Sequence, residues 1–158
     1  MQKPPEQLKL SPATRAVQAL HMIDERTGAV SPMIDLSSTY ARDEEYAPRQ
    51  SYIYGRDGGS TVKHAEAVLA SLEGGNASML FGSGMAAFVA LMETLDFGDH
   101  VVAPKIMYHA GITWIHRLFE KRGIEATFFD QTDPDALENA IHKGKTRIVW
   151  IESPTNPN

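Results

Sequence analysis

Hydrophobic and polar positions divide the chain into an irregular front part and a regular back part. In the front part, the stretch SPATRAVQALHMIDERTG predicts a helix with Ser11 as N-cap, Pro12 at the first helical position and Gly28 as terminator. Residues 29–60 give extended or looped signals, because prolines and the run RDGGS interrupt any helical period. The pattern therefore predicts one helix followed by a long extended arm.

The back part alternates between helical and strand patterns. From Thr61 apolar residues recur at helical spacing until EGGN ends the helix. The stretches ASMLF, HVVAP, IEATFFD and TRIVWIE then predict strands, and the stretches GMAAFVALMETL, HAGITWIHRLFEKRG and DPDALENAIHKG between them predict helices. This alternation predicts an α/β fold with a mainly parallel sheet and helices on both faces. Ligands of such sheets bind beyond the carboxyl ends of the strands.

The loop FGSGMAA, residues 81–87, follows the first expected strand and opens a helix. Its glycines allow close approach to a ligand, and the amides of Gly84 and Met85 start the helix, where unpaired N–H groups favour an anion such as phosphate. A tight turn that needs glycine for its own geometry is the alternative. The spacing also approximates a dinucleotide fingerprint, but Lys105 stands near the place where that fingerprint needs an acidic residue. A nicotinamide-dependent oxidoreductase therefore remains an alternative.

Three other stretches carry candidate ligand-binding side chains. Tyr54 and Arg56 are two residues apart in the arm, so in an extended segment they project to the same side and form a phosphate clamp. Tyr108 follows a strand, where its ring would stack on a planar ligand, and ESPTNPN presents Asn156 after the last strand. The alternatives are a surface arginine beside a packed tyrosine, an ordinary loop aromatic and a turn-forming asparagine.

Composition narrows the possible partners and locations. A net charge of -5 and a pI near 5.6 argue against nucleic acid as a partner. The chain has no cysteine, and no apolar run approaches the roughly 20 residues that a membrane span needs. The start MQKPPEQLKL lacks the apolar core of a signal peptide, so we expect a cytoplasmic protein. His109 and His116 have no carboxylate partner at ligand spacing, so we expect no metal site.

In combination, these motifs resemble the pyridoxal phosphate (PLP) enzymes of cysteine and methionine metabolism. YGR, AEAVLASLEGG, SGMAA, the tyrosine after the following strand and ESPTNPN occur in the order and at the spacing of that family, from about Ser31 to the end. The resemblance implies the N-terminal part of a fold-type I, aspartate aminotransferase-like enzyme. It also implies that residues 1–60 contact a neighbouring subunit, and that residues 61–158 form the first half of the PLP-binding large domain.

The same resemblance implies roles for individual residues. Ser83 and the amides of Gly84 and Met85 would receive the cofactor phosphate. Tyr108 would stack on the pyridine ring and, as the catalytic residue, help to deprotonate the incoming amino group. Asn156 would form a hydrogen bond to the phenolic oxygen of the ring.

Tyr54 and Arg56, by the same resemblance, would reach the phosphate bound by a neighbouring subunit. That arrangement would explain an arm too loose to belong to its own core. It implies a homo-oligomer with shared active sites, commonly a dimer of dimers.

The implied activity is that of a PLP-dependent lyase or transferase of the transsulfuration type. Its substrates would be sulfur-containing or O-acylated homoserine-type amino acids, which react by γ-replacement or by β- or γ-elimination. HAG at residues 109–111 lacks the cysteine that methionine γ-lyases carry after the tyrosine, which argues against that specific activity. We expect the family's Schiff-base lysine, its pyridine-nitrogen aspartate and its substrate-binding arginine beyond Asn158. The chain would then be an N-terminal fragment that is inactive alone, and a noncatalytic interaction domain is a further alternative.

Overall fold

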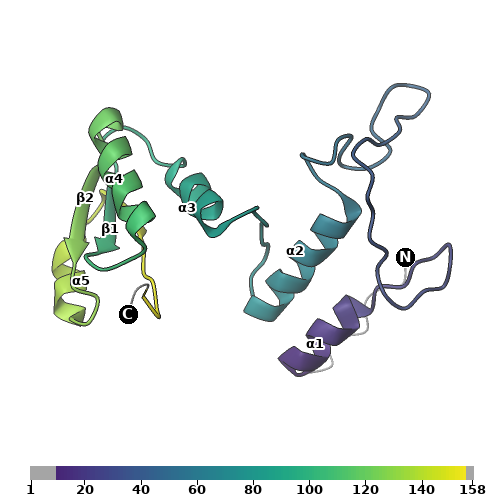
Figure 1. Cartoon of the computed structure of the whole chain (residues 1–158), viewed down its shortest axis with the longest axis horizontal. Helices are drawn as coiled ribbons and strands as arrows, with labels where there is room; N and C mark the ends of the chain where they lie inside the picture. Colours follow the sequence, from purple (N-terminus) through teal and green to yellow (C-terminus); the bar gives the residue numbers. More distant parts are fainter. Residues whose placement is uncertain (1–9, 156–158) are drawn as a thin grey trace. The chain divides into compact units, whose positions relative to one another are not determined.

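A computed structural model of the chain describes residues 10–155, except the side chains of Ala19 and Leu118 (Figure 1). The chain forms two compact units that meet in sequence between Leu80 and Phe81. The first unit contains α1 (Pro12–Gln18), a 3-10 helix η1 (Ala19–His21) and α2 (Ser60–Glu73). The second contains α3 (Gly84–Met92), β1 (His100–Pro104), α4 (His109–Arg122), β2 (Glu125–Phe129), α5 (Pro134–Ala140) and β3 (Thr146–Val149).

The first helical segment is shorter than the sequence predicts. The α-helix ends at Gln18, and the following η1 contains Leu20 and His21 at positive φ. The carboxylate of Asp24 accepts hydrogen bonds from both the N–H and the hydroxyl of Thr27, each at 2.8 Å. Such local side-chain bonds stabilise a turn at the expense of a helix. The prediction of one helix running to Gly28 was therefore wrong.

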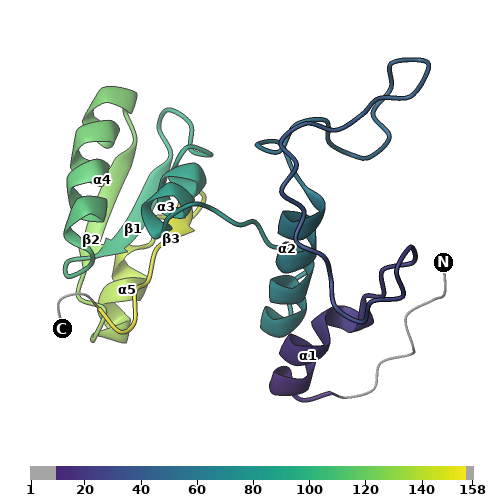
Figure 2. The ribbon, with the colours of Figure 1, turned by 45° about the vertical axis from the view of Figure 1, so that its right-hand side comes forward.

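The arm has almost no regular structure, as predicted. Residues 22–59 contain only two isolated antiparallel bridges, Thr39 with Tyr54 and Arg42 with Pro48 (Figure 2). The carboxylate of Asp35 orders part of this segment, because it accepts from the N–H of Ser37 at 2.8 Å, the hydroxyl of Tyr40 at 3.0 Å and the hydroxyl of Ser60 at 3.1 Å. These bonds, the first of them above all, lower the pKa of Asp35. Asp35 thereby ties the arm to the start of α2.

The sheet of the second unit is parallel, with strand order β2-β1-β3. The connection from β1 through α4 runs to one side of β1, and the connection from β2 through α5 returns to the other side. Because such crossovers are right-handed, this reversal places α4 and α5 on opposite faces of the sheet. The predicted α/β class with a parallel sheet is confirmed.

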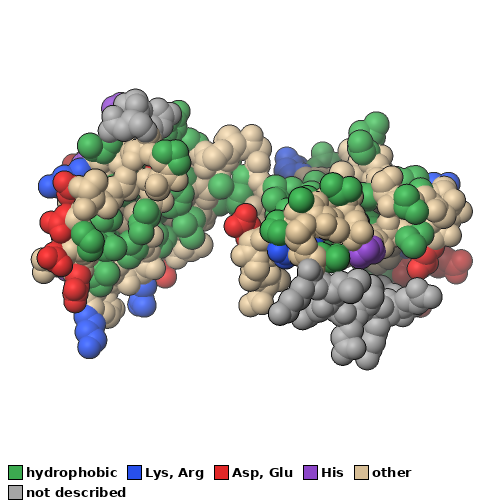
Figure 3. All heavy atoms as spheres, turned by 90° about the horizontal axis from the view of Figure 1, so that it is seen from below, with side chains coloured by type: hydrophobic (Ala, Val, Ile, Leu, Met, Phe, Trp, Pro, Cys, Tyr) green, Lys and Arg blue, Asp and Glu red, His purple; other side chains and the backbone are tan. Residues whose placement is uncertain are grey.

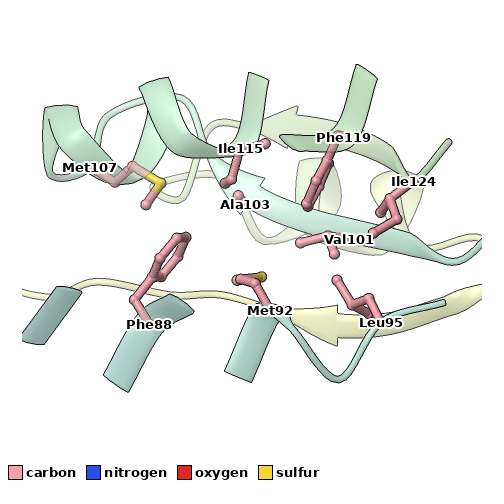
Figure 4. Packing of buried hydrophobic residues seen from close by; sticks show 9 residues of the cluster. All are labelled: Phe88, Met92, Leu95, Val101, Ala103, Met107, Ile115, Phe119 and Ile124. Carbon is pink, nitrogen blue, oxygen red and sulfur yellow. The ribbon is translucent and has the colours of Figure 1, made fainter. Parts of the chain in front are cut away.

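The core lies on both sides of β1, all of whose residues are buried. Alternate side chains of a strand point to opposite faces. Val101 and Ala103 pack with α3 and α4, whereas Val102 packs with Phe129 and Ala140 on the α5 side. Figure 4 shows the larger cluster, to which α3 contributes Phe88 and Met92 and α4 contributes Ile115 and Phe119. Its other members come from β1 and the connecting loops: Leu95, Val101, Ala103, Met107 and Ile124.

One predicted strand is absent. ASMLF, residues 77–81, is extended but forms no ladder with any described residue. Met79, Leu80 and Phe81 are exposed to 70%, 41% and 38%. An extended segment becomes a strand only when a partner satisfies its backbone groups, and apolar character alone does not supply that partner.

Among the helices of the described residues, none is long and apolar enough to cross a membrane.

Candidate functional site

A pocket of about 570 Å³ lies at the carboxyl ends of β1 and β3 in the second unit. Its walls come from the start of α3, the loop after β1 and the segment after β3. These two strands flank the position where the crossover connections change direction, which is where parallel α/β sheets bind ligands. The volume falls within the range of about 300–1,000 Å³ that is common for small-molecule sites. Topology and size therefore both indicate a small-molecule site.

The start of α3 supplies the polar end of this pocket. Ser83 is the N-cap, and its hydroxyl oxygen accepts a hydrogen bond from the N–H of Ala86 at 3.1 Å. That bond leaves the hydroxyl hydrogen of Ser83 available for donation. The N–H groups of Gly84 and Met85 have no hydrogen-bond partner among the described residues. A Cβ built on Gly84 would meet no atom within 4 Å, so the backbone there is open to a ligand. Three donors and the positive end of a helix dipole thus face a space suited to an anion.

Tyr108 lines the same pocket from the start of α4. Its backbone N–H donates to Oε2 of Glu152 at 3.1 Å, and its carbonyl accepts from the N–H of Gly111 at 2.9 Å. The Tyr108 side chain is 46% exposed. The structure therefore brings Tyr108 together with Ser83, Gly84 and Met85, while the roles expected for these four residues stay predictions.

The apolar wall of the pocket consists of aromatic and methionine side chains. The rings of Phe88 and Trp150 meet edge to face, with centroids 4.9 Å apart. Met107 and Phe88 point toward one another from opposite sides (Figure 4). Gly111 leaves room for this packing, because a Cβ at that position would lie 2.7 Å from the Met107 methyl carbon. Such a wall suits a flat ring more than a flexible polar chain.

Two of the expected binding residues lie in the first unit. The Arg56 guanidinium lies 5.2 Å from the centre of the Tyr54 ring, a cation–π arrangement. Tyr54 is held by its bridge to Thr39, and the N–H of Gly55 donates to the carbonyl of Ser38 at 2.7 Å. Both Tyr54 and Arg56 are exposed. Asn156 lies outside the described residues.

Sequence reasoning missed other residues of this pocket. Glu152 stands in the ESPTNPN motif, in which only Asn156 was predicted to bind a ligand. In the sequence, three other pocket residues are ordinary apolar positions: Phe88, Met107 and Trp150. Only their convergence in space distinguishes them. The available signal for Glu152 was its place directly beyond a parallel strand, at the edge where ligands bind.

The described residues that line the pocket do not supply the positive charge that a multiply charged anion needs. Among the described residues that line it there is a carboxylate, Glu152, and no Lys or Arg. The described part of the chain also holds no group of three or more His, Cys, Asp or Glu suited to a metal ion. A multiply charged anion would therefore depend on the α3 amides and on a cation from elsewhere.

Comparison with known proteins identifies the kind of ligand. Residues 13–158 match the family model described as Cys/Met metabolism PLP-dependent enzyme. The chain belongs to this family. It is 41% identical over 147 residues to a cystathionine gamma-synthase of Mycobacterium tuberculosis, and 38% identical over 134 residues to a cystathionine gamma-lyase of Bacillus subtilis. The crystal structure of metB from Corynebacterium glutamicum matches with a TM-score of 0.85 and 31% identity.

These matches cover most of this chain but a minor part of each relative. The synthase alignment covers 92% of this chain and 38% of the relative, and the lyase alignment covers 85% and 35%. The alignment with the solved structure covers 98% of this chain and 40% of the other chain. The chain thus spans about two fifths of the length of these family members.

The pocket fits the cofactor of the family, pyridoxal phosphate. The unpaired amides of Gly84 and Met85, with the open space over Gly84, match a phosphate group. The Tyr108 ring and the wall of Phe88 and Trp150 match a planar heterocycle. The family match favours PLP over the nicotinamide alternative, and the charge of Lys105 agrees with that choice.

Proposed function

We propose that this chain provides the phosphate-binding part of a PLP-dependent enzyme of the transsulfuration type. Its substrates would be sulfur-containing or O-acylated homoserine-type amino acids, which undergo γ-replacement or β- or γ-elimination. The observation that carries this proposal is the convergence of the unpaired α3 amides and Tyr108 in one pocket at the carboxyl ends of β1 and β3. The named synthase and lyase relatives support the reaction class.

Individual residues have defined parts in this proposal. The N–H groups of Gly84 and Met85 and the hydroxyl of Ser83 hold the phosphate, and the ring of Tyr108 packs on the heterocycle. Asn156 donates to the phenolic oxygen, as the family resemblance implies. When bound, PLP supplies an electron sink that stabilises negative charge at the α-carbon of an amino acid. The apolar wall around Phe88 and Trp150 excludes water from that region.

Tyr108 is the proposed proton acceptor for the amino group of the substrate. A phenol performs that role at neutral pH only where nearby positive charge favours its ionised form. The residues that line the pocket include no Lys or Arg, so the charge has to come from outside this set. In our proposal Arg56 of a neighbouring subunit supplies this charge. Together with Tyr54 of the same neighbour, it reaches into the pocket of this chain and binds the phosphate there.

The proposed active enzyme is therefore a homo-oligomer, with a dimer as the smallest active form and a dimer of dimers as the expected assembly. Apolar side chains on the surface of the first unit support this, because water-exposed hydrophobic groups gather at protein interfaces (Figure 3). The most exposed of them are Leu36 at 91%, Val17 at 86%, Val30 at 81%, Tyr46 at 80% and Ile34 at 76%. A cytoplasmic location belongs to the same proposal.

Replacement of Ser83 by aspartate tests the phosphate site. Aspartate caps a helix about as well as serine, so Ser83→Asp is expected to change the free energy of unfolding by less than about 1 kcal/mol. Its negative charge, however, repels a phosphate at the same helix start. We expect PLP affinity, titrated by visible absorption in the full-length protein, to fall at least about tenfold, which corresponds to about 1.4 kcal/mol.

Ser83→Thr is the matched control, because it keeps both the cap and the hydroxyl donor, and it is expected to bind PLP with nearly unchanged affinity. If the unmodified protein does not bind PLP, the noncatalytic alternative replaces the proposal. If Ser83→Asp binds PLP as tightly as the unmodified protein, the phosphate does not lie at the start of α3.

A further inference from the structure

We propose that Glu152 is a positioning residue, whose carboxylate fixes the backbone of Tyr108 and thereby the direction in which the Tyr108 ring enters the pocket. This inference rests on the proposed function, in which that ring packs on the bound heterocycle. It assigns a specific role to a residue that sequence reasoning did not single out.

Hydrogen bonds fix the backbone of Tyr108 on both sides of its Cα. Tyr108 is the N-cap of α4, and its side chain makes no capping hydrogen bond. Its carbonyl is held by the N–H of Gly111 at 2.9 Å, and its own N–H is held by Oε2 of Glu152 at 3.1 Å. The two peptide planes that flank the Tyr108 Cα are thus both fixed. Because they set the direction of the Cα–Cβ bond, they also set the region that the ring can reach.

The topology of the sheet brings Glu152 to the loop that carries Tyr108. Glu152 and Tyr108 are 44 residues apart in sequence and follow neighbouring parallel strands, β3 and β1. Val102 pairs with Val149, and the N–H of Trp150 donates to the Val102 carbonyl at 2.8 Å, which continues the alignment beyond β3. A side chain two residues later is therefore delivered to the loop after β1. The contact couples the two segments between which a ligand would bind.

The negative charge of Glu152 is compensated at the start of α4. A carboxylate in a pocket for an anion opposes binding unless other groups compensate it. The Glu152 carboxylate accepts from a backbone N–H at the start of α4, where the helix dipole favours negative charge. The start of α4, which Glu152 positions, therefore offsets the negative charge of the Glu152 carboxylate. This accounts for an acidic side chain in the wall of an anion site without assigning it a direct contact with the ligand.

The test compares Glu152→Ala with Glu152→Gln in the full-length protein. The first readout needs no cofactor: amide hydrogen exchange of the peptide that contains the Tyr108 N–H. We expect severalfold faster exchange in Glu152→Ala and largely restored protection in Glu152→Gln, which keeps an oxygen acceptor. Glu138→Ala, on the exposed face of α5, is the matched control and is expected to leave this exchange unchanged.

The second readout is the induced circular dichroism of bound PLP, which reports how the ring is held, together with its dissociation constant. Glu152→Ala is expected to reduce the signal and weaken binding about 3- to 30-fold, and Glu152→Gln to recover most of both. In a Tyr108→Ala background the same Glu152→Ala change is expected to have little further effect, because its action passes through the Tyr108 ring.

Unchanged exchange at Tyr108 in Glu152→Ala would overturn the inference, and so would an equal loss of PLP affinity with and without the Tyr108 ring. Failure of the proposed function looks different. The unmodified protein would then bind no PLP, while hydrogen exchange would still decide whether Glu152 holds Tyr108.

Discussion

The imidazole ring of His100 stacks on that of His142, with centroids 4.1 Å apart and planes 14° from parallel. His100 is fully buried in β1, and its ring nitrogens bond the hydroxyls of Thr146 at 2.8 Å and Thr127 at 2.9 Å. Burial, and secondly the charge that His142 carries when protonated, lower the pKa of His100 from its usual 6.5. Folding therefore favours the neutral form of His100.

We predict that this histidine makes the protein less stable in mild acid. Glu125 opposes the lowering of the His100 pKa and Lys145 adds to it, but the net direction is downward. An unfolded histidine takes up a proton as the pH falls through about 6.5, whereas buried His100 resists it until its own lower pKa. The stabilisation is thus present above pH 6.5 and is lost as the pH falls through the folded pKa. Urea unfolding at about pH 7.5 and 5.5 is expected to show a lower free energy of unfolding at the acidic pH.

His100→Gln provides the comparison, because an amide donates and accepts hydrogen bonds but does not titrate. Its free energy of unfolding is expected to change less between the two pH values than that of the unmodified protein. His116→Gln, on the exposed face of α4, is the control and keeps the original pH dependence. Equal pH dependence in His100→Gln and the unmodified protein would show that His100 is not the responsible group.

Much of the second unit follows from short-range sequence signals. HVVAP matches β1, His100–Pro104, because a short and mainly apolar run suits the central strand of a parallel sheet. Gly123, with φ of 64°, ends α4 as its position predicted, and Asp133 caps α5 with its side chain. The failures have a different origin. ASMLF lacks a partner strand among the described residues, and partner choice is a long-range property that a local pattern does not contain.

The candidate site was partly predictable from local sequence signals. Parallel strands end at one edge of a sheet, so the loop at Ser83 and the position of Tyr108 were expected to face a common ligand, and both line one pocket. The position of Glu152 near the end of a strand was a signal for the pocket, but its contact with Tyr108 was not predictable, because that hydrogen bond joins its carboxylate to a backbone N–H 44 residues away. No residue type or spacing predicts such a bond, because it depends on how β3 aligns with β1.

The helix-ending glycines give a second prediction. Gly123 has φ of 64° and Gly74 has φ of 68°, and each follows the last residue of its helix. Alanine at either site has to adopt the left-handed conformation, which costs about 1–2 kcal/mol. A Cβ on Gly123 would also overlap the ring of Phe97, whereas one on Gly74 would meet no atom within 4 Å. Gly123→Ala is therefore expected to lower the free energy of unfolding by about 0.5–1.5 kcal/mol more than Gly74→Ala.

Removal of the Phe97 ring separates the two effects. Relative to Phe97→Ala alone, the added Gly123→Ala change is expected to cost only as much as Gly74→Ala. The four variants can be compared by urea unfolding, with the double mutant completing the cycle. If Gly123→Ala costs no more than Gly74→Ala in the presence of Phe97, the overlap carries no energy and the ring simply turns aside.

The third prediction concerns the origin of the phosphate clamp. If Arg56 serves the pocket of a neighbouring subunit, then Arg56→Ala and Ser83→Asp damage the same site from two different chains. Each variant alone is expected to lose PLP-dependent activity. In a co-expressed mixture, a dimer with one chain of each kind has one site in which the pocket and the arm are both intact. Random pairing makes half of the dimers mixed, so about a quarter of all sites are expected to recover.

Activity of the purified mixed dimer, isolated through a different affinity tag on each chain, tests this recovery, and about half of its sites are expected to be active. Mixed dimers of Ser83→Asp with itself are the control and are expected to remain inactive. Arg56→Lys adds a graded comparison, because it keeps the charge but not the forked geometry that binds phosphate through two parallel bonds. Mixed dimers as inactive as their parents would mean that the arm serves its own chain. Full activity in Arg56→Ala alone would remove Arg56 from the site, and the cation that the pocket lacks would then have to be sought on another element.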